Sequence, residues 1–169
     1  MIEGEQVILR PWLETDIPAL TVLRNDPVLQ GSLLSRARGN STLQIREWLD
    51  KKSRAEDGFF FVISDTNDLR PIGYLQLSKL NLTDKYVELG ICLLPAARGK
   101  GLGSQAIVLA SNYLKANWGV RKVILAVRLD NEAAIKCYTR LGFANCGTHR
   151  QHFYFAGEWH DVILMEKLL

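Results

Sequence analysis

The sequence predicts an α/β domain of the α+β type, in which one mixed, mostly antiparallel sheet carries helices on both faces. Three observations support this fold class. The 169 residues are 47% hydrophobic and 23% charged, which is typical of an ordinary globular domain. Strand-like runs outnumber helical ones, and short polar breaks separate several of them, as in antiparallel hairpins. No repeat, linker or low-complexity stretch divides the chain, so we expect a single domain over residues 1–169.

The first part of the chain predicts one strand and two helices. Gln6–Arg10 is typical of a short strand, and a helix follows from Thr15 to the Asn25-Asp26-Pro27 breaker. Residues 33–40 are expected to be irregular. Asn40 or Ser41 then caps a second helix, whose apolar side chains recur at helical spacing.

The middle of the chain predicts an antiparallel meander. Three strand-like runs cover residues 59–64, 71–80 and 85–94. The breaks between them, at residues 66–68 and 81–84, have the length and composition of hairpin turns. Consecutive strands of this region should therefore pair with each other.

The last part of the chain adds two helices to the sheet, and its expected order is helix, strand, helix and a closing hairpin. The elements cover residues 102–117, 122–127, 131–141, 148–155 and 159–168. The complete order is then β-α-α-β-β-β-α-β-α-β-β, which is a single sheet with helices packed on it.

Composition excludes several functional classes. The net charge of +3 is small and the basic residues are scattered, so we expect no nucleic-acid partner. No apolar run approaches the roughly 20 residues that span a bilayer, so we expect no membrane partner. The first residues lack a signal-peptide pattern. The three cysteines lack CxxC spacing, which fits free thiols in a cytoplasmic protein.

A glycine-rich segment is the most informative local feature. Gly99, Gly101 and Gly103 stand at alternate positions directly before a predicted helix. Glycine permits unusual dihedral angles and close approach to the backbone, and a helix N-terminus offers free N–H groups and a positive dipole end. The segment therefore indicates an anion site, with a pyrophosphate as the natural occupant and with Arg98 and Lys100 supplying charge.

Two known phosphate-binding motifs also contain closely spaced glycines. A Walker A loop is excluded because Gly101, not Ser or Thr, follows Lys100. Gly101, Gly103 and Ala106 satisfy the dinucleotide pattern G-x-G-x-x-A, but residues 95–98 separate the loop from the preceding strand. The chain also offers only one β-α-β unit. A glycine-rich connection without a ligand remains the plain structural alternative.

A second motif follows about thirty residues later. Asn131, Ala134, Tyr138 and Gly142-Phe143 form the pattern N-x-x-A-x-x-x-Y-x-x-x-G-F, and residues 98–103 form R-x-x-G-x-G. Together, in this order, they resemble the GNAT superfamily of N-acetyltransferases, and the resemblance covers the whole chain. The start "LRPW" and the closing residues from Gly147 resemble most the branch of ribosomal-protein N-terminal acetyltransferases.

The resemblance implies acetyl-CoA as a co-substrate, with no metal. The family binds its pantetheine along the strand before the loop, its pyrophosphate on the loop, and further groups on the next helix. Carried over to this chain, the cofactor positions are Ile91, Cys92, Leu93, Arg98, Gly99, Lys100, Gly101, Leu102, Gly103, Ser104, Asn131 and Lys136. Asn131 is also expected to cap its helix.

Two side chains are expected to carry the chemistry. Tyr138 matches the family's general acid, which protonates the departing thiolate, although a core aromatic would also fit its apolar stripe. Glu88 is the candidate base, because an aliphatic amine with a pKa near 10 must lose a proton. A salt-bridged surface glutamate is the equally open alternative. Cys92 is not expected to act as a nucleophile, because direct attack by the amine needs no acyl-enzyme.

The acceptor is the least determined part. Arg24, Arg36, Arg38 and Asp161 occupy regions that build the acceptor pocket in the family, yet a solvated loop or a turn explains them as well. The expected partner is a small-molecule or peptide amine, with a homodimer as an open possibility. His149 and His152 are expected to face opposite sides of a strand, which argues against a metal site. A non-catalytic domain that binds or senses CoA is the alternative function.

Overall fold

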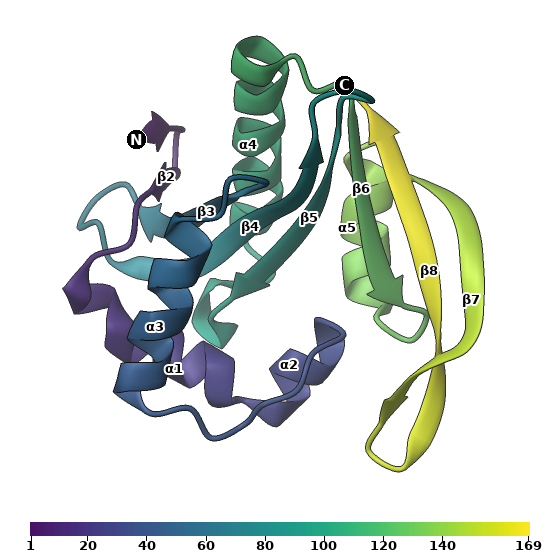
Figure 1. The fold of residues 1–169 in the computed structure, drawn as a ribbon, viewed down its shortest axis with the longest axis horizontal. Coiled ribbons are helices and arrows are strands. Elements are labelled where there is room, and N and C mark those ends of the chain that lie inside the picture. Colours follow the sequence, from purple (N-terminus) through teal and green to yellow (C-terminus); the bar gives the residue numbers. More distant parts are fainter.

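The computed structural model describes residues 1–169 and confirms the predicted fold class. One eight-stranded mixed sheet forms the centre, in the order β1-β2-β3-β4-β5-β6-β8-β7 (Figure 1). The strands are β1 (Ile2–Glu3), β2 (Val7–Arg10), β3 (Phe59–Asp65), β4 (Pro71–Asn81), β5 (Tyr86–Leu93), β6 (Lys122–Arg128), β7 (Ala144–Phe155) and β8 (Glu158–Leu168). All pairs are antiparallel except β5 with β6.

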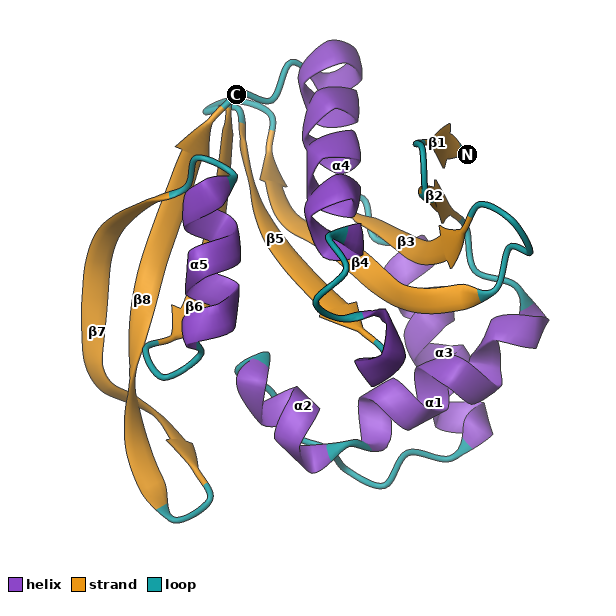
Figure 2. Cartoon of the chain, turned by 180° about the vertical axis from the view of Figure 1, so that it is seen from behind, coloured by secondary structure: helices purple, strands orange, loops and turns teal.

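Helices cover both faces of this sheet (Figures 1 and 2). One face carries α1 (Ile17–Asn25), α2 (Pro27–Ser32) and α3 (Thr42–Ser53), and the other carries α4 (Leu102–Trp118) and α5 (Glu132–Arg140). Short 3₁₀ turns, η1 (Glu14–Asp16) and η2 (Pro95–Ala97), precede α1 and the glycine loop. None of the helices is long and apolar enough to cross a membrane.

Two hydrophobic clusters correspond to the two faces. The larger one lies under α4 and α5 and includes Val87, Leu89 and Ala106. The smaller one lies under α1 and α3 and includes Leu23, Tyr74 and Cys92. Since side chains alternate along a strand, β5 supplies Val87 and Leu89 to one cluster and Cys92 to the other. The side chains of β5 therefore connect the sheet to the helices on both of its faces.

A buried ion pair fixes the entry into α1. The Arg10 guanidinium donates from Nη1 to Asp16 Oδ2 at 2.7 Å and from Nη2 to Asp16 Oδ1 at 2.8 Å. Both side chains are almost fully buried. The two parallel hydrogen bonds hold the 3₁₀ turn η1 against β2, and α1 continues directly from that turn.

The sheet divides between its two parallel strands. β5 pairs with β6 only through Tyr86, Val87 and Glu88. Beyond Glu88 the two strands diverge, while β6 stays paired with β8 as far as Arg128 (Figure 1). Residues 89–93 of β5 therefore turn an unpaired backbone edge toward β6. Buried or half-buried backbone groups need partners, so this edge is suited to bind an extended ligand.

The structure differs from the sequence prediction at the N-terminal helices. The Asn25-Asp26-Pro27 breaker ends α1 but also begins α2, a helix that was not predicted from the sequence. The Asp26 carboxylate caps α2 by accepting the Leu29 N–H at 2.9 Å, and Pro27 takes the first helical position. Proline is favoured there because its missing N–H would be unpaired anyway.

Candidate active site

The glycine loop presents a continuous row of backbone donors. Gly99 has φ +73° and Gly101 has φ +78°, so both adopt the left-handed conformation that glycine allows. No backbone or side-chain acceptor bonds the N–H groups of residues 99–104. A β-carbon added at Gly99 or Gly101 would meet nothing within 4 Å, so the space above the loop is open. Six free donors at a helix N-terminus suit a pyrophosphate.

Two basic side chains flank these donors. Arg98 is exposed, and its Nε donates to the Leu93 carbonyl at 3.0 Å, which ties the loop to the end of β5. Lys100 is exposed and takes part in no ion pair. Gly103 lies so close to β5 that an added β-carbon would stand 3.2 Å from Leu93 Cδ1. The loop and the unpaired edge of β5 thus form one continuous surface.

Cys92 lies near the end of that edge and its side chain is buried. Burial raises the pKa of the Cys92 thiol to about 12, against smaller opposing effects of a hydrogen bond with Tyr74 and of the Arg98 and Arg24 charges. The thiol therefore stays protonated at neutral pH. A protonated, buried thiol is a poor nucleophile, in agreement with the expectation that Cys92 carries no acyl group.

The helix α5 brings the second motif to the loop. Asn131 caps α5 as predicted, because its Oδ1 accepts the Ala134 N–H at 3.3 Å. Ser104 Oγ and Cys137 Sγ lie 3.3 Å apart, so the first turn of α4 touches α5 beside Tyr138. Lys136 is exposed, and its Nζ lies 3.9 Å from Glu132.

Tyr138 has properties of both a packing residue and a proton donor. Its ring is half-buried and packs edge-on against Phe143, with the centroids 5.8 Å apart. Its hydroxyl makes no hydrogen bond to another residue of the chain. Burial, followed by the nearby Cys137, raises the pKa of Tyr138 to about 12. The phenol is therefore fully protonated at neutral pH, as a proton donor must be.

Glu88 lies where β5 and β6 begin to diverge, since it is the last residue of β5 that pairs with β6. Its half-buried carboxylate accepts a hydrogen bond from Lys79 Nζ at 2.7 Å. Four residues of strand separate Glu88 from Cys92, which is about 13 Å at 3.3 Å per residue. A proton passing between an amine at Cys92 and Glu88 would need water between them.

Three candidate acceptor residues lie on the face of α1, α2 and α3. Arg24 is half-buried at the end of α1, with its guanidinium 4.6 Å from the centre of the Trp48 ring. Arg36 reaches the closing hairpin, where its Nη2 donates to the Tyr154 carbonyl and its guanidinium covers the Phe153 ring. Arg38 is exposed and makes no contact of this kind.

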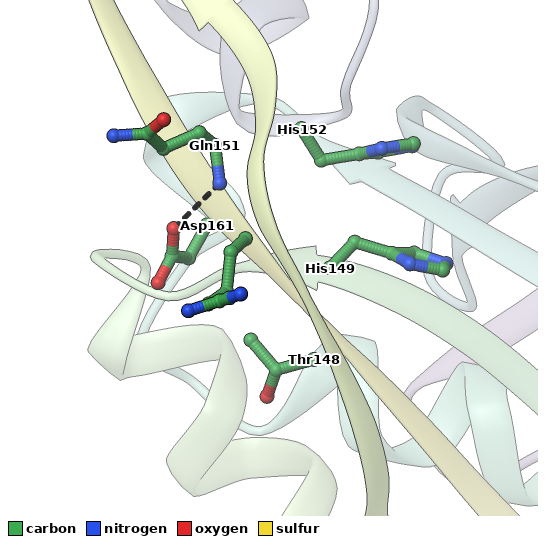
Figure 3. A pocket seen from close by; sticks show the side chains of 6 residues that line it. Thr148, His149, Gln151, His152 and Asp161 are labelled. Atoms are coloured by element: carbon green, nitrogen blue, oxygen red, sulfur yellow. Dashed lines mark hydrogen bonds between the residues drawn. The ribbon is translucent and has the colours of Figure 1, made fainter.

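Asp161 is not brought together with these arginines. It alternates along β8 with His160 and Val162 and therefore shares a face with Ile163, which belongs to the cluster under α4 and α5. Its Oδ1 accepts the Gln151 N–H at 2.8 Å, inside a pocket formed by the irregular part of β7 (Figure 3). Its carboxylate thus stabilises the irregular backbone of β7, which fits the interpretation of Asp161 as a structural residue.

The expectation that His149 and His152 face opposite sides of a strand was wrong. His149 and His152 lie on the same side of β7, with their rings stacked and the centroids 4.6 Å apart (Figure 3). The register shifts between His149 and Phe153, and Gln151 adopts φ +47°. This bulge breaks the alternation on which the expectation rested. No group of three or more His, Cys, Asp or Glu side chains is placed to hold a metal ion.

Sequence reasoning missed two polar residues beside Arg24. Gln30 is fully buried on α2, and its Oε1 accepts from Arg24 Nη1 at 3.0 Å. Tyr74 pairs across the sheet with Cys92. The antiparallel register of the meander could have placed Tyr74, but Gln30 was out of reach because α2 itself was not predicted.

Comparisons with known proteins agree with this arrangement. The acetyltransferase (GNAT) domain family matches residues 6–144. Spermidine N(1)-acetyltransferase of Escherichia coli K12 is 32% identical over 98% of this chain and 87% of its own length. Phosphinothricin N-acetyltransferase of Streptomyces viridochromogenes is 25% identical over 95% of this chain and 86% of its own.

A solved structure gives the same fold. Spermidine N-acetyltransferase from Vibrio cholerae, in complex with CoA and spermine, superposes with a TM-score of 0.90 and 24% identity. The match covers 98% of this chain and 96% of that one. These relatives do not support the finer expectation of a ribosomal-protein branch. The family match and the full-length relative show that the chain belongs to the GNAT family and is an acetyl-CoA-dependent N-acetyltransferase.

Proposed function

We propose that the enzyme transfers the acetyl group of acetyl-CoA to the primary amine of a small molecule by direct attack in a ternary complex. One observation carries this proposal. Six consecutive free N–H groups adjoin the unpaired edge of β5. One surface therefore offers both a binding site for an anion and unpaired backbone groups for an extended ligand. A pyrophosphate with an extended pantetheine arm has the shape and the polar groups to use both.

The relatives support a small acceptor. The E. coli relative is a spermidine acetyltransferase, and the S. viridochromogenes relative is a phosphinothricin acetyltransferase. Both names denote small amines, although of different charge. We therefore favour a small-molecule amine over the N-terminus of a protein.

In the proposed complex the pyrophosphate lies over residues 98–104, with Arg98 and Lys100 beside it. The backbone of Ile91, Cys92 and Leu93 holds the pantetheine and orients the thioester. Asn131 and Lys136 contact the same cofactor from α5. The acceptor enters from the face of α1, α2 and α3, past Arg24, Arg36 and Arg38. Asp161, on the other face, takes no part.

The proposed chemistry moves two protons. An ammonium acceptor first gives a proton to Glu88 through water, and the free amine then attacks the thioester carbonyl. A nitrogen–carbon bond forms and the carbon–sulfur bond breaks, with the electron pair going to the CoA sulfur. Tyr138, which is protonated at neutral pH, gives its proton to that sulfur. The nitrogen loses its second proton as the neutral amide forms, and this proton replaces the one that Tyr138 has given.

A thiol-release assay tests this proposal. The protein is mixed with acetyl-CoA and a panel of amines, namely polyamines, amino acids, amino sugars and N-terminal peptides, and free CoA thiol is followed. We expect amine-dependent release with at least one small amine and less with peptides. Tight binding of acetyl-CoA without release for any amine would instead favour the non-catalytic CoA-binding domain.

A further inference from the structure

Arg24 is a cation without a counter-ion. Its Nη1 donates to Gln30 Oε1 at 3.0 Å, and its guanidinium stacks on the Trp48 ring. Its Nε is buried and has no hydrogen-bond partner, and Arg24 takes part in none of the ion pairs of the chain. Arg24 therefore offers a positive charge that pairs with no carboxylate of the chain.

The surroundings of Arg24 do not neutralise it. Asp26, two residues further along the chain, caps α2 with its carboxylate and forms no ion pair with Arg24. Lys52 adds a second positive charge, and burial together with the Arg24 charge lowers the pKa of that lysine. Residues 24–40 contain three arginines and one aspartate, with no lysine or glutamate. The local net charge is therefore 3 − 1 = +2.

Arg24 also lies next to the expected site of the thioester. The Trp48 ring under its guanidinium packs edge-on against Tyr74, with the centroids 5.5 Å apart, and Tyr74 stands opposite Cys92 in the sheet. Arg36 extends the positive charge across the same face, because it joins the loop after α2 to β7. An acceptor that approaches β5 from this face therefore meets a positively charged surface.

We infer that the acceptor carries a negatively charged group, a carboxylate or a phosphate, which pairs with the guanidinium of Arg24. This inference rests on the proposed function. The guanidinium of arginine is a planar fork of donors that matches both anions. Gln30 and Trp48 hold the fork in place before the acceptor binds. A polyamine would bring further positive charge to a region whose net charge is already positive.

Matched acceptor pairs test the inference. Lysine differs from cadaverine by its carboxylate, and glucosamine 6-phosphate differs from glucosamine by its phosphate. We expect kcat/KM to be at least tenfold higher for the anionic member of one pair, and which pair responds identifies the anion. Spermidine should be a poor acceptor. A preference for cadaverine or spermidine over every anionic amine would overturn the inference while leaving the proposed function intact.

Variants assign the effect to Arg24. Arg24→Gln should abolish the preference within the responding pair, mainly through KM, whereas Arg24→Lys should keep part of it. Arg54→Gln removes an equally charged but exposed side chain from the end of α3 and should change nothing. Melting curves confirm that each variant is folded. A preference that survives in folded Arg24→Gln would overturn the assignment.

A binding measurement distinguishes failure of the anion site from failure of the proposed acetyltransferase activity. If no amine of the panel is acetylated, the proposed function fails. The anion site is then judged by calorimetric binding of glucosamine 6-phosphate and of lysine to the protein saturated with CoA. Binding that is lost in Arg24→Gln but kept in Arg54→Gln supports the site, and binding equal in all three proteins, or absent in all, contradicts it.

Discussion

Replacement of Gly101 by valine tests most sharply whether the glycine loop binds the pyrophosphate. Gly101 is the N-cap of α4, with φ +78° and ψ −5°, and a side chain there would project into open space. In the free protein the substitution therefore costs only backbone strain, about 1–3 kcal/mol for a non-glycine residue in this region. For a chain of this length that strain lowers the melting temperature by about 2–12 °C.

The effect on acetyl-CoA should be larger than strain alone explains. The valine side chain would stand over the N–H groups that we assign to the pyrophosphate. A hydrogen bond to a charged group contributes about 1.5–3 kcal/mol, which corresponds to a roughly 10- to 150-fold change in dissociation constant. We expect calorimetry to show acetyl-CoA binding weakened more than tenfold.

The same helix provides the control. Gly119 at the C-terminus of α4 also has a positive φ, +62°, and an added β-carbon there also meets nothing within 4 Å. Gly119→Val should lose comparable stability and keep the affinity for acetyl-CoA. Equal affinity in folded Gly101→Val and Gly119→Val would remove the loop from the cofactor site.

Three further predictions concern single side chains. Tyr138→Phe keeps the ring and should lower kcat by about 10²-fold, the low end for general acid catalysis, with unchanged acetyl-CoA binding and melting temperature; near-normal kcat would return Tyr138 to a packing role. Asp16→Asn leaves the buried Arg10 charge unpaired and should cost about 3–5 kcal/mol in urea unfolding; an unaltered midpoint would show that the pair adds nothing. Because the pKa of Cys92 rises from 9.0 to about 12 on folding, the unfolded thiol loses its proton first, so the stability present below pH 9 should decline between pH 9 and pH 12. Cys92→Ala should flatten this decline in melting curves, most clearly below pH 10, where the tyrosines do not yet contribute, and an equally steep decline would exclude Cys92 as its cause.

Local signals were sufficient for most of the fold. The meander of β3, β4 and β5 follows from apolar runs of strand length separated by hairpin turns, and the structure confirms it. The glycine loop was found because Gly99 and Gly101 need positive φ values, which only glycine adopts without strain. The cap at Asn131 follows from its place between a strand and a helix.

Features that depend on contacts between distant parts of the chain could not be predicted from local sequence signals. Asp26-Pro27 ends one helix and starts another, and only the packing of α2 against the hairpin distinguishes the two outcomes: a β-carbon at Gly31 would lie 2.4 Å from the Phe155 ring. The bulge at Gln151 depends on the Asp161 carboxylate ten residues away. The surroundings of Arg24 come from separate segments, so no single motif could mark them.

The central claim is that the acetyl group passes directly from acetyl-CoA to the amine. Following a labelled acetyl group tests it directly. Acetyl-CoA labelled in its acetyl carbons is incubated with the enzyme and a small amine, and amine, acetate, CoA and protein are analysed by mass spectrometry. We expect the label on the amine nitrogen, with one free CoA for each acetylated amine and no label on the protein. Label recovered as acetate without acetylated amine, or bound to the protein at Cys92, would contradict direct transfer to the amine.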